Sequence, residues 1–195
     1  MLVATLLHLD KFSKDTLAFN LWFGIYIVTP IWVPLLWFRN RRRDPHVLEA
    51  GDIVVPQWVR IASAVIGVGA LAFALVLFAL PQFGTSALNF WVWKLTPLTA
   101  RVTAAAIAFP AVAWLMLARD LRWSAWRVPV EVQMVALGFT LLGIPRELDN
   151  FAWDRIATWL FVAVLVVLEA ASIMLYIRME IRRRAVVVGV ATAVS

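Results

Sequence analysis

The residue whose type and position could do chemistry is Glu169, a carboxylic acid in the middle of the apolar segment IATWLFVAVLVVLEAASIMLYI. A charged side chain at the centre of a membrane helix costs about 2.5–3.5 kcal/mol on insertion scales, so an ionisable group there is a candidate functional site. At helical spacing it shares one face with Thr158, Ser172 and Tyr176. Such a group binds a proton, an ion or a ligand, or it stays protonated and hydrogen-bonds to a neighbouring helix.

The candidate partners of Glu169 lie on the two preceding apolar segments. Gln133 and Thr140 belong to the nearer segment, and Arg101 lies one turn inside the other. We therefore predict an intramembrane polar site that contains Glu169, Ser172, Gln133 and Arg101. Two other interpretations of Arg101 stay open. Its side chain extends to the membrane surface, or it pairs with the acidic stretch IPRELDNFAWDR.

Other carboxylates lie near the predicted helix ends and indicate surface charge. Glu131 is expected to form an ion pair with one of the arginines of residues 119–127. The spacing of Glu147, Asp149 and Asp154 matches no metal-ligand pattern. We therefore predict no metal site among them.

The composition excludes several kinds of site. The chain has no cysteine, which excludes disulfides, thiolate catalysis and cysteine metal sites. Its two histidines, His8 and His46, lie outside the apolar segments, so neither paired haem ligands nor a histidine metal cluster is expected. No lysine lies inside an apolar segment, which excludes a retinal-type Schiff base, and nucleotide-binding and hydrolase motifs are missing. We expect no cofactor and no catalytic residue.

The apolar composition indicates that these residues are positioned by membrane helices. Sixty-three per cent of the 195 residues are hydrophobic and the mean hydropathy is +0.85, whereas soluble domains use roughly 45–50% apolar residues. A soluble fold of this length could not bury so much apolar surface. We predict an all-α, polytopic helical membrane bundle, one domain over residues 1–195. A span needs about 20 apolar residues, and five segments qualify: 17–38, 58–80, 98–118, 128–144 and 156–177.

Both ends of the chain carry shorter apolar runs. MLVATLL at residues 1–7 is too short to cross a membrane and lacks the basic start of a signal peptide. We hypothesise that it is the end of a sixth, N-terminal span. AVVVGVATAVS at residues 185–195 is also too short, and is either interfacial or another truncated end.

The arginines predict an orientation, because Lys and Arg concentrate in cytoplasmic loops. Five spans place twelve of the eighteen basic residues on one side: Arg39, Arg41, Arg42, Arg43, Arg60, Arg119, Arg122, Arg127, Arg178, Arg182, Arg183 and Arg184. If segment 128–144 did not cross, the division would be ten to eight. We therefore predict an outside N-terminus and a cytoplasmic C-terminus. Fifteen arginines against three lysines is a bias typical of GC-rich bacterial genomes, which indicates a bacterial cytoplasmic membrane.

Small residues predict one helix contact. They recur at packing spacing on segments 58–80 and 98–118, where they let two backbones approach closely. The set is Ser63, Gly67, Ala70, Ala74, Ala100, Ala104 and Ala108.

Three stretches together resemble a group of small, uncharacterised bacterial polytopic membrane proteins. They are HLDKFSKDTLAFNLWFGIYIVTPIWVPLLWFRNRRRDP, WVWKLTPLTAR and FAWDRIATWLF. Their most specific pieces are the RNRR-x-DP motif and LTPLTAR, and the similarity covers roughly residues 8–178. The resemblance implies a helical membrane architecture with further helical sequence upstream. It implies no activity, cofactor or catalytic residue.

The leading functional hypothesis is a non-enzymatic structural, interaction or accessory component of the membrane. Its partners would be the bilayer, with anionic headgroups at the cytoplasmic face, and a membrane protein or a second copy of the chain. A nucleic-acid partner is not expected, because the arginines lie at the ends of spans rather than on one soluble face. One alternative is a small permease or ion-coupled channel that uses Glu169. A second is an enzyme that acts on a lipid-linked substrate at the outer loops, through Arg101, Glu147, Asp149 or Asp154.

Overall fold

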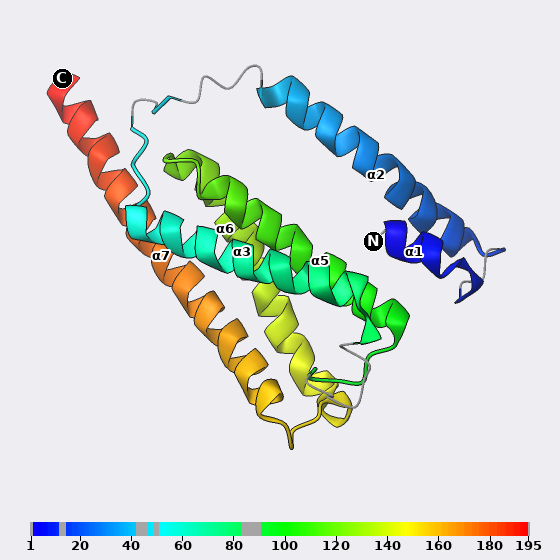
Figure 1. Ribbon diagram of the computed structural model, residues 1–195. Coiled ribbons are helices and arrows are strands. Elements are labelled where there is room, and N and C mark those ends of the chain that lie inside the picture. The colour runs from blue at the N-terminus through cyan, green and yellow to red at the C-terminus, as the bar shows by residue number, and fades with distance from the viewer. Residues whose placement is uncertain (1, 12–14, 42–46, 49–50, 83–90, 195) are drawn as a thin grey trace.

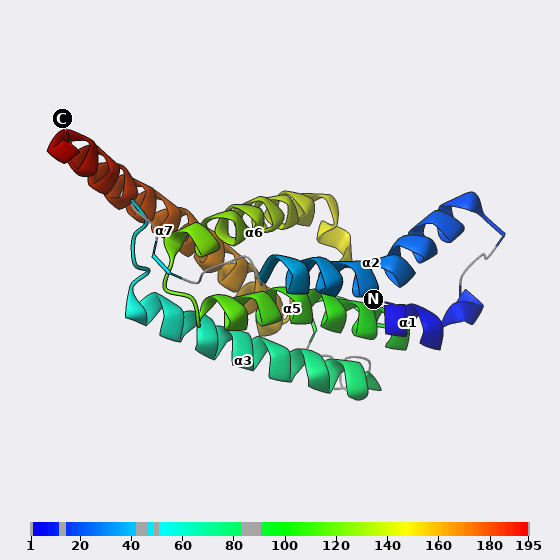
Figure 2. The ribbon, with the colours of Figure 1, turned by 90° about the horizontal axis from the view of Figure 1, so that it is seen from above.

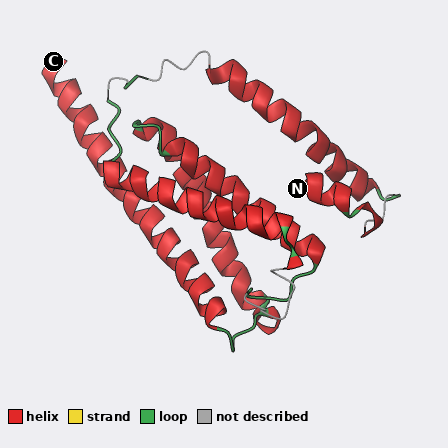
Figure 3. Cartoon of the chain, viewed as in Figure 1, coloured by secondary structure: helices red, strands yellow, loops and turns green. Residues whose placement is uncertain are grey.

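The computed structural model describes residues 2–11, 15–41, 47–48, 51–82 and 91–194. Five helices in these ranges are long and apolar enough, by length and composition, to cross a membrane. This confirms the predicted all-α bundle, and Figure 3 shows helices joined by loops throughout the described part. The helices are α1 (Leu2–Leu7), α2 (Leu17–Arg41), α3 (Gln57–Ala79), α5 (Pro97–Leu117), α6 (Trp123–Gly143) and α7 (Ile156–Val194).

The helices pair into two hairpins. Helices α3 and α5 lie side by side as the most extensive contact in the fold, and α6 and α7 form the second pair (Figure 1). Figure 2 shows α6 on the opposite side of α5 from α3. Helix α2 packs mainly against α1, and none of its membrane-length window is buried.

The close approach of α3 and α5 depends on small residues, as the sequence predicts. Ala74, Ala100 and Ala104 are buried between the two helices. A Cβ atom on Gly67 would lie 2.9 Å from the Leu115 side chain and 3.0 Å from a backbone oxygen of α5, so only glycine fits there. Because hydrocarbon tails are as apolar as leucine, such packing replaces the hydrophobic effect as the force that joins membrane helices.

Two buried clusters lie at opposite ends of α3. One contains Trp91, Val92 and Leu95 of the loop before α5, packed on the C-terminal part of α3. The other joins the segment before α3 to α6 and α7, and it is organised around Trp123. There, Val54 and Arg122 form an isolated antiparallel bridge, in which backbone hydrogen bonds tie residues 53–55 to residues 121–123.

Two helices extend beyond the predicted spans. Helix α6 begins at Trp123 rather than at residue 128, because the buried Trp123 and Trp126 belong to its first turns despite the adjacent arginines. Helix α7 continues through residue 194 rather than ending at 177, so the apolar tail at 185–194 extends that helix. Its 39 residues correspond to a length of about 58 Å, well beyond the ~30 Å hydrocarbon core of a bilayer.

One end of the bundle gathers many of the arginines, and we call residues 51–60, 118–127 and 176–184 the basic end. Arg60 Nε donates to the Ala118 carbonyl over 3.1 Å, which joins the start of α3 to the end of α5. The basic end carries Arg60, Arg119, Arg122, Arg127, Arg178, Arg182, Arg183 and Arg184. Of the other predicted topology anchors, Arg39 and Arg41 lie in the last turn of α2, and Arg42 and Arg43 lie outside the described residues.

Replacing Gly67 by alanine should loosen the α3–α5 pair. The added methyl group meets the backbone of α5, which cannot move aside as a side chain can. We expect a loss of about 1–3 kcal/mol, the usual range for overpacking, measured as a lower unfolding midpoint of the detergent-solubilised protein.

The matched control is Gly69→Ala on the same helix, where a Cβ atom would have no neighbour within 4 Å. That variant should be as stable as the original protein. Equal midpoints for Gly67→Ala and the original protein would contradict the close-packing explanation.

Candidate functional site

Glu169 lies on α7 and faces α6 at a glycine. A Cβ atom on Gly138 would lie 3.9 Å from Glu169 Oε1, so the missing side chain leaves room for the carboxyl group. The other oxygen, Oε2, is buried and has no hydrogen-bonding partner among the described residues. A buried acceptor without a donor costs about 1–3 kcal/mol, so this group lies in an energetically unfavourable position.

Gln133 joins three helices one turn away. Its Oε1 accepts a hydrogen bond from Trp114 Nε1 of α5 over 2.6 Å, and its Nε2 donates to Ser172 Oγ of α7 over 3.5 Å. Ser172 in turn donates to the Leu168 carbonyl over 2.8 Å. The structure thus brings together Gln133 and Ser172, with Glu169 three residues before Ser172 on the same helix.

The other two residues considered as partners lie elsewhere. Thr140 donates to the Ala136 carbonyl of its own helix over 2.8 Å. Arg101 Nη1 lies 2.7 Å from His8 Nε2, and its Nε donates to the Phe78 carbonyl over 3.4 Å. Among the described residues, Arg101 pairs neither with Glu169 nor with the acidic stretch 144–155.

The acidic stretch between α6 and α7 does not assemble a reactive site. Glu147 Oε2 accepts a hydrogen bond from Asn150 over 2.6 Å, and Glu147, Asp149 and Asp154 are all exposed. Within the described ranges, no group of three or more His, Asp or Glu side chains could hold a metal ion. The residues predicted for an enzyme at the outer loops therefore do not form one site. Arg101 contacts His8, and the three carboxylates lie in the loop between α6 and α7.

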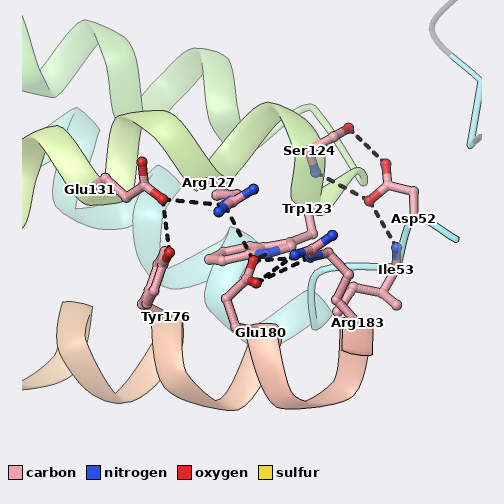
Figure 4. Close-up of polar contacts among 9 residues, drawn as sticks. All are labelled: Asp52, Ile53, Trp123, Ser124, Arg127, Glu131, Tyr176, Glu180 and Arg183. Atoms are coloured by element: carbon pink, nitrogen blue, oxygen red, sulfur yellow. Dashed lines mark hydrogen bonds and ion pairs between the residues drawn. The ribbon is translucent and has the colours of Figure 1, made fainter. Parts of the chain in front are cut away.

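A larger polar network lies at the basic end, centred on Glu180 (Figure 4). Glu180 is only 7% exposed, and its Oε1 accepts a hydrogen bond from the indole Nε1 of the fully buried Trp123 over 3.0 Å. Arg183 Nη2 donates to its Oε2 over 2.9 Å, and Arg127 Nε lies 3.3 Å from its Oε1. The carboxylate thus balances the positive charge of two arginines and accepts the hydrogen bond of one buried indole.

Arg127 links this network to a second carboxylate. Its Nε lies 3.2 Å from Glu131 Oε1, which confirms the ion pair predicted for Glu131. The same oxygen accepts a hydrogen bond from the Tyr176 hydroxyl over 2.9 Å. Arg127 and Glu131 of α6 are therefore connected to Tyr176 and Glu180 of α7 (Figure 4).

Asp52 fixes the start of α6 from outside the helix. Its Oδ1 accepts from the backbone N–H groups of Ile53 and Ser124, over 2.8 and 3.2 Å, and its Oδ2 accepts from the Ser124 hydroxyl over 2.7 Å. A carboxylate at a helix N-terminus satisfies free N–H groups and favours the helix dipole. Asp52 therefore holds the segment before α3 against α6.

The polar side chains of α7 form one stripe, which we call the α6–α7 seam: Glu169, Ser172, Tyr176, Glu180 and Arg183. Except for Glu169, each has a hydrogen bond from its side chain. The seam leads from the middle of α7 to the basic end. Sequence reasoning stopped at Tyr176 and missed Glu180, although the spacing of three or four residues continues through Glu180 to Arg183.

Comparisons with family models, curated proteins and solved structures find no match to this chain. The site is therefore interpreted from its own geometry.

Replacing Glu180 by alanine should weaken the basic end. Trp123 Nε1 would lose its acceptor inside a buried cluster, and Arg127 and Arg183 would lose a shared counter-charge. Both arginines are partly exposed, so water replaces much of their interaction with the carboxylate. The main loss in the free energy of unfolding therefore comes from the buried indole N–H left without an acceptor, about 1–3 kcal/mol. The measurement is the unfolding midpoint in detergent.

Asp154→Ala provides the control, because Asp154 is an exposed carboxylate in the loop just before α7, far along the chain from Glu180. It should leave the midpoint unchanged. If Glu180→Ala behaved in the same way, the network would not contribute to stability.

Proposed function

We propose that this chain is a multi-pass protein of a bacterial cytoplasmic membrane with its basic end at the cytoplasmic face. Two observations support the orientation. The fold gathers eight arginines at that end, and arginines concentrate on the cytoplasmic side of membrane proteins. Five membrane-length helices then put the start of α2 outside and the end of α7 inside.

Reporter fusions test this orientation. A fusion after Arg43 should show cytoplasmic activity and a fusion after Arg155 periplasmic activity, because an odd number of spans separates the two sites. Alkaline phosphatase and a fluorescent protein serve as the paired reporters. The reverse pattern would invert the proposed orientation, and the same side for both would remove one of the spans between them.

We further propose that Glu169 binds and releases a proton, as the coupling group of a small permease or ion-coupled channel. The observation that carries this proposal is the buried Glu169 Oε2 without a hydrogen-bonding partner among the described residues. If Glu169 served only to join α7 to a neighbouring helix, its oxygens would be held by donors on that helix. No such donor holds Glu169 Oε2 among the described residues, so a joining role alone does not account for this oxygen.

The surroundings of Glu169 supply polar groups on both sides. Toward the basic end lies the rest of the α6–α7 seam, with Ser172 and Tyr176 as hydroxyl groups. Toward the other end, a cavity of about 530 Å³ is lined by Thr140 of α6 and extends to Lys94 and Glu147. Along α7, Glu169 thus lies between Phe161, which lines this cavity, and the polar residues of the seam.

Proton flux tests the role of Glu169. Purified protein in liposomes that contain a pH-sensitive dye should pass protons down an imposed gradient, and Glu169→Gln should abolish that flux. Glutamine keeps the size and polarity of the side chain but cannot titrate, so the loss would be chemical rather than structural. Asp149→Asn, at an exposed carboxylate that does not line the cavity, is the control that should retain flux.

Equal flux in the original protein and Glu169→Gln would reject the coupling role. An accessory component of the membrane would then be the better function. The observation that favours it is α2, a 25-residue apolar helix that packs mainly against the short α1. Its evidence would be a stoichiometric membrane protein that co-purifies after mild detergent extraction.

A further inference from the structure

A cavity of about 160 Å³ lies between the two hairpins, in the half of the bundle next to the basic end. All four helices contribute to its walls, including Ala62 of α3, Leu117 of α5, Val130 of α6 and Leu168 of α7. The lining is largely hydrocarbon. The polar exceptions are Ser63, Gln133, Ser172 and the indole groups of three tryptophans.

The cavity exists because the hairpins pack tightly within themselves and little against each other. Helices α3 and α5 contact along their lengths, and so do α6 and α7, but α5 and α6 meet at only a few positions. The cavity is partly open at the surface of the bundle, and its mainly apolar walls favour hydrocarbon over water. Left empty, it forfeits dispersion contacts along its lining. A hydrocarbon chain restores those contacts, and a bilayer supplies such chains at high concentration.

Two arginines that follow lining residues, without lining the cavity themselves, form no ion pair among the described residues. Trp58 and Leu117 line the cavity, two residues before Arg60 and Arg119 respectively. The bond from Arg60 Nε to the Ala118 carbonyl brings these two arginine positions together. Among the described residues, neither arginine forms an ion pair.

Three other arginines of the basic end differ in this respect. Arg122 pairs with Asp120, Arg127 with Glu131 and Glu180, and Arg183 with Glu180. Arg178, Arg182 and Arg184 of α7 also form no ion pair among the described residues, but Arg60 and Arg119 are the unpaired arginines at the ends of α3 and α5 that meet beside the cavity. Their positive charge complements an anionic group held at the level of the membrane surface.

We propose that this cavity binds a segment of one acyl chain of an anionic phospholipid, whose phosphate group lies against Arg60 and Arg119. The apolar walls hold the chain, and the two arginines select an anionic headgroup. Trp58, which is exposed at the cavity, lies where an amphipathic ring is favoured, between hydrocarbon and headgroups. Lipid binding at this site does not depend on Glu169, so it can be tested independently of the proposed transport function.

The test is native mass spectrometry of the full-length protein in detergent, titrated with palmitoyl-oleoyl phosphatidylglycerol or with the zwitterionic phosphatidylcholine of the same chains. One phosphatidylglycerol should bind at concentrations where phosphatidylcholine does not. The double variant Arg60→Gln/Arg119→Gln should weaken that binding by about thirtyfold, since each charge near a membrane surface contributes about fivefold. Arg184→Gln, an exposed arginine of α7 that lies nine residues beyond Leu175, the last lining residue of that helix, should change it little.

The chain-binding half of the proposal has its own variant. Ala62→Leu fills part of the cavity and should abolish binding of phosphatidylglycerol. Ala72→Leu makes the same change at an exposed position of α3 and should not. Unfolding midpoints of both variants without added lipid are measured alongside, so that a misfolded protein is recognised. If Ala62→Leu misfolds, the arginine pair decides the outcome.

Three results would overturn the proposal. Equal affinity for phosphatidylglycerol and phosphatidylcholine would show that the two arginines do not select an anionic headgroup. Retained binding in a folded Ala62→Leu would place the chain elsewhere. Displacement of the lipid by millimolar inorganic phosphate would show that a free anion, rather than a phospholipid, is the ligand of the two arginines.

Discussion

The buried indole of Trp123 joins the two helical hairpins at the basic end. It lies between the segment before α3, which pairs with it through a backbone hydrogen bond from Trp123 N to Ile53 O, and α7, where Glu180 accepts from its side chain. Elsewhere the hairpins meet little. Because lipid does not drive apolar helices together as water does, this polar and aromatic contact sets where α6 and α7 lie relative to α3 and α5. The cavity between the hairpins is a consequence of that arrangement.

Gln133 is the second connection between the hairpins, and it also sets the environment of Glu169. Its Oε1 accepts from Trp114 and its Nε2 donates to Ser172, and these bonds hold the amide on those two residues, with no hydrogen bond to Glu169 Oε2. Gly138 offers space but no hydrogen bond. Around Glu169, α6 thus presents a glutamine that is hydrogen-bonded to other residues and a glycine that has no side chain to donate.

Much of the architecture is predictable from sequence because each membrane helix is a local property of about twenty residues. The five segments, the α3–α5 contact through Gly67 and the Glu131–Arg127 pair all follow from spacing along one or two helices. Contacts between distant segments were not predictable in this way. Arg101 contacts His8 only because α1 lies beside α5.

Glu180 and Asp52 were missed for a related reason. Glu180 stands in the charged run RMEIRRR, which resembles a solvated surface, and nothing in that run shows that Trp123 will cover it. Asp52 lies in a loop and stabilises α6, a helix that begins about seventy residues later.

The length of helix α7 has a mechanical consequence. Residue 194 lies about 37 Å along this continuous helix from Glu169. A tilt of about 10° around Glu169 would displace that end by about 6 Å, so a small rearrangement at the carboxyl group would be felt far outside the hydrocarbon layer.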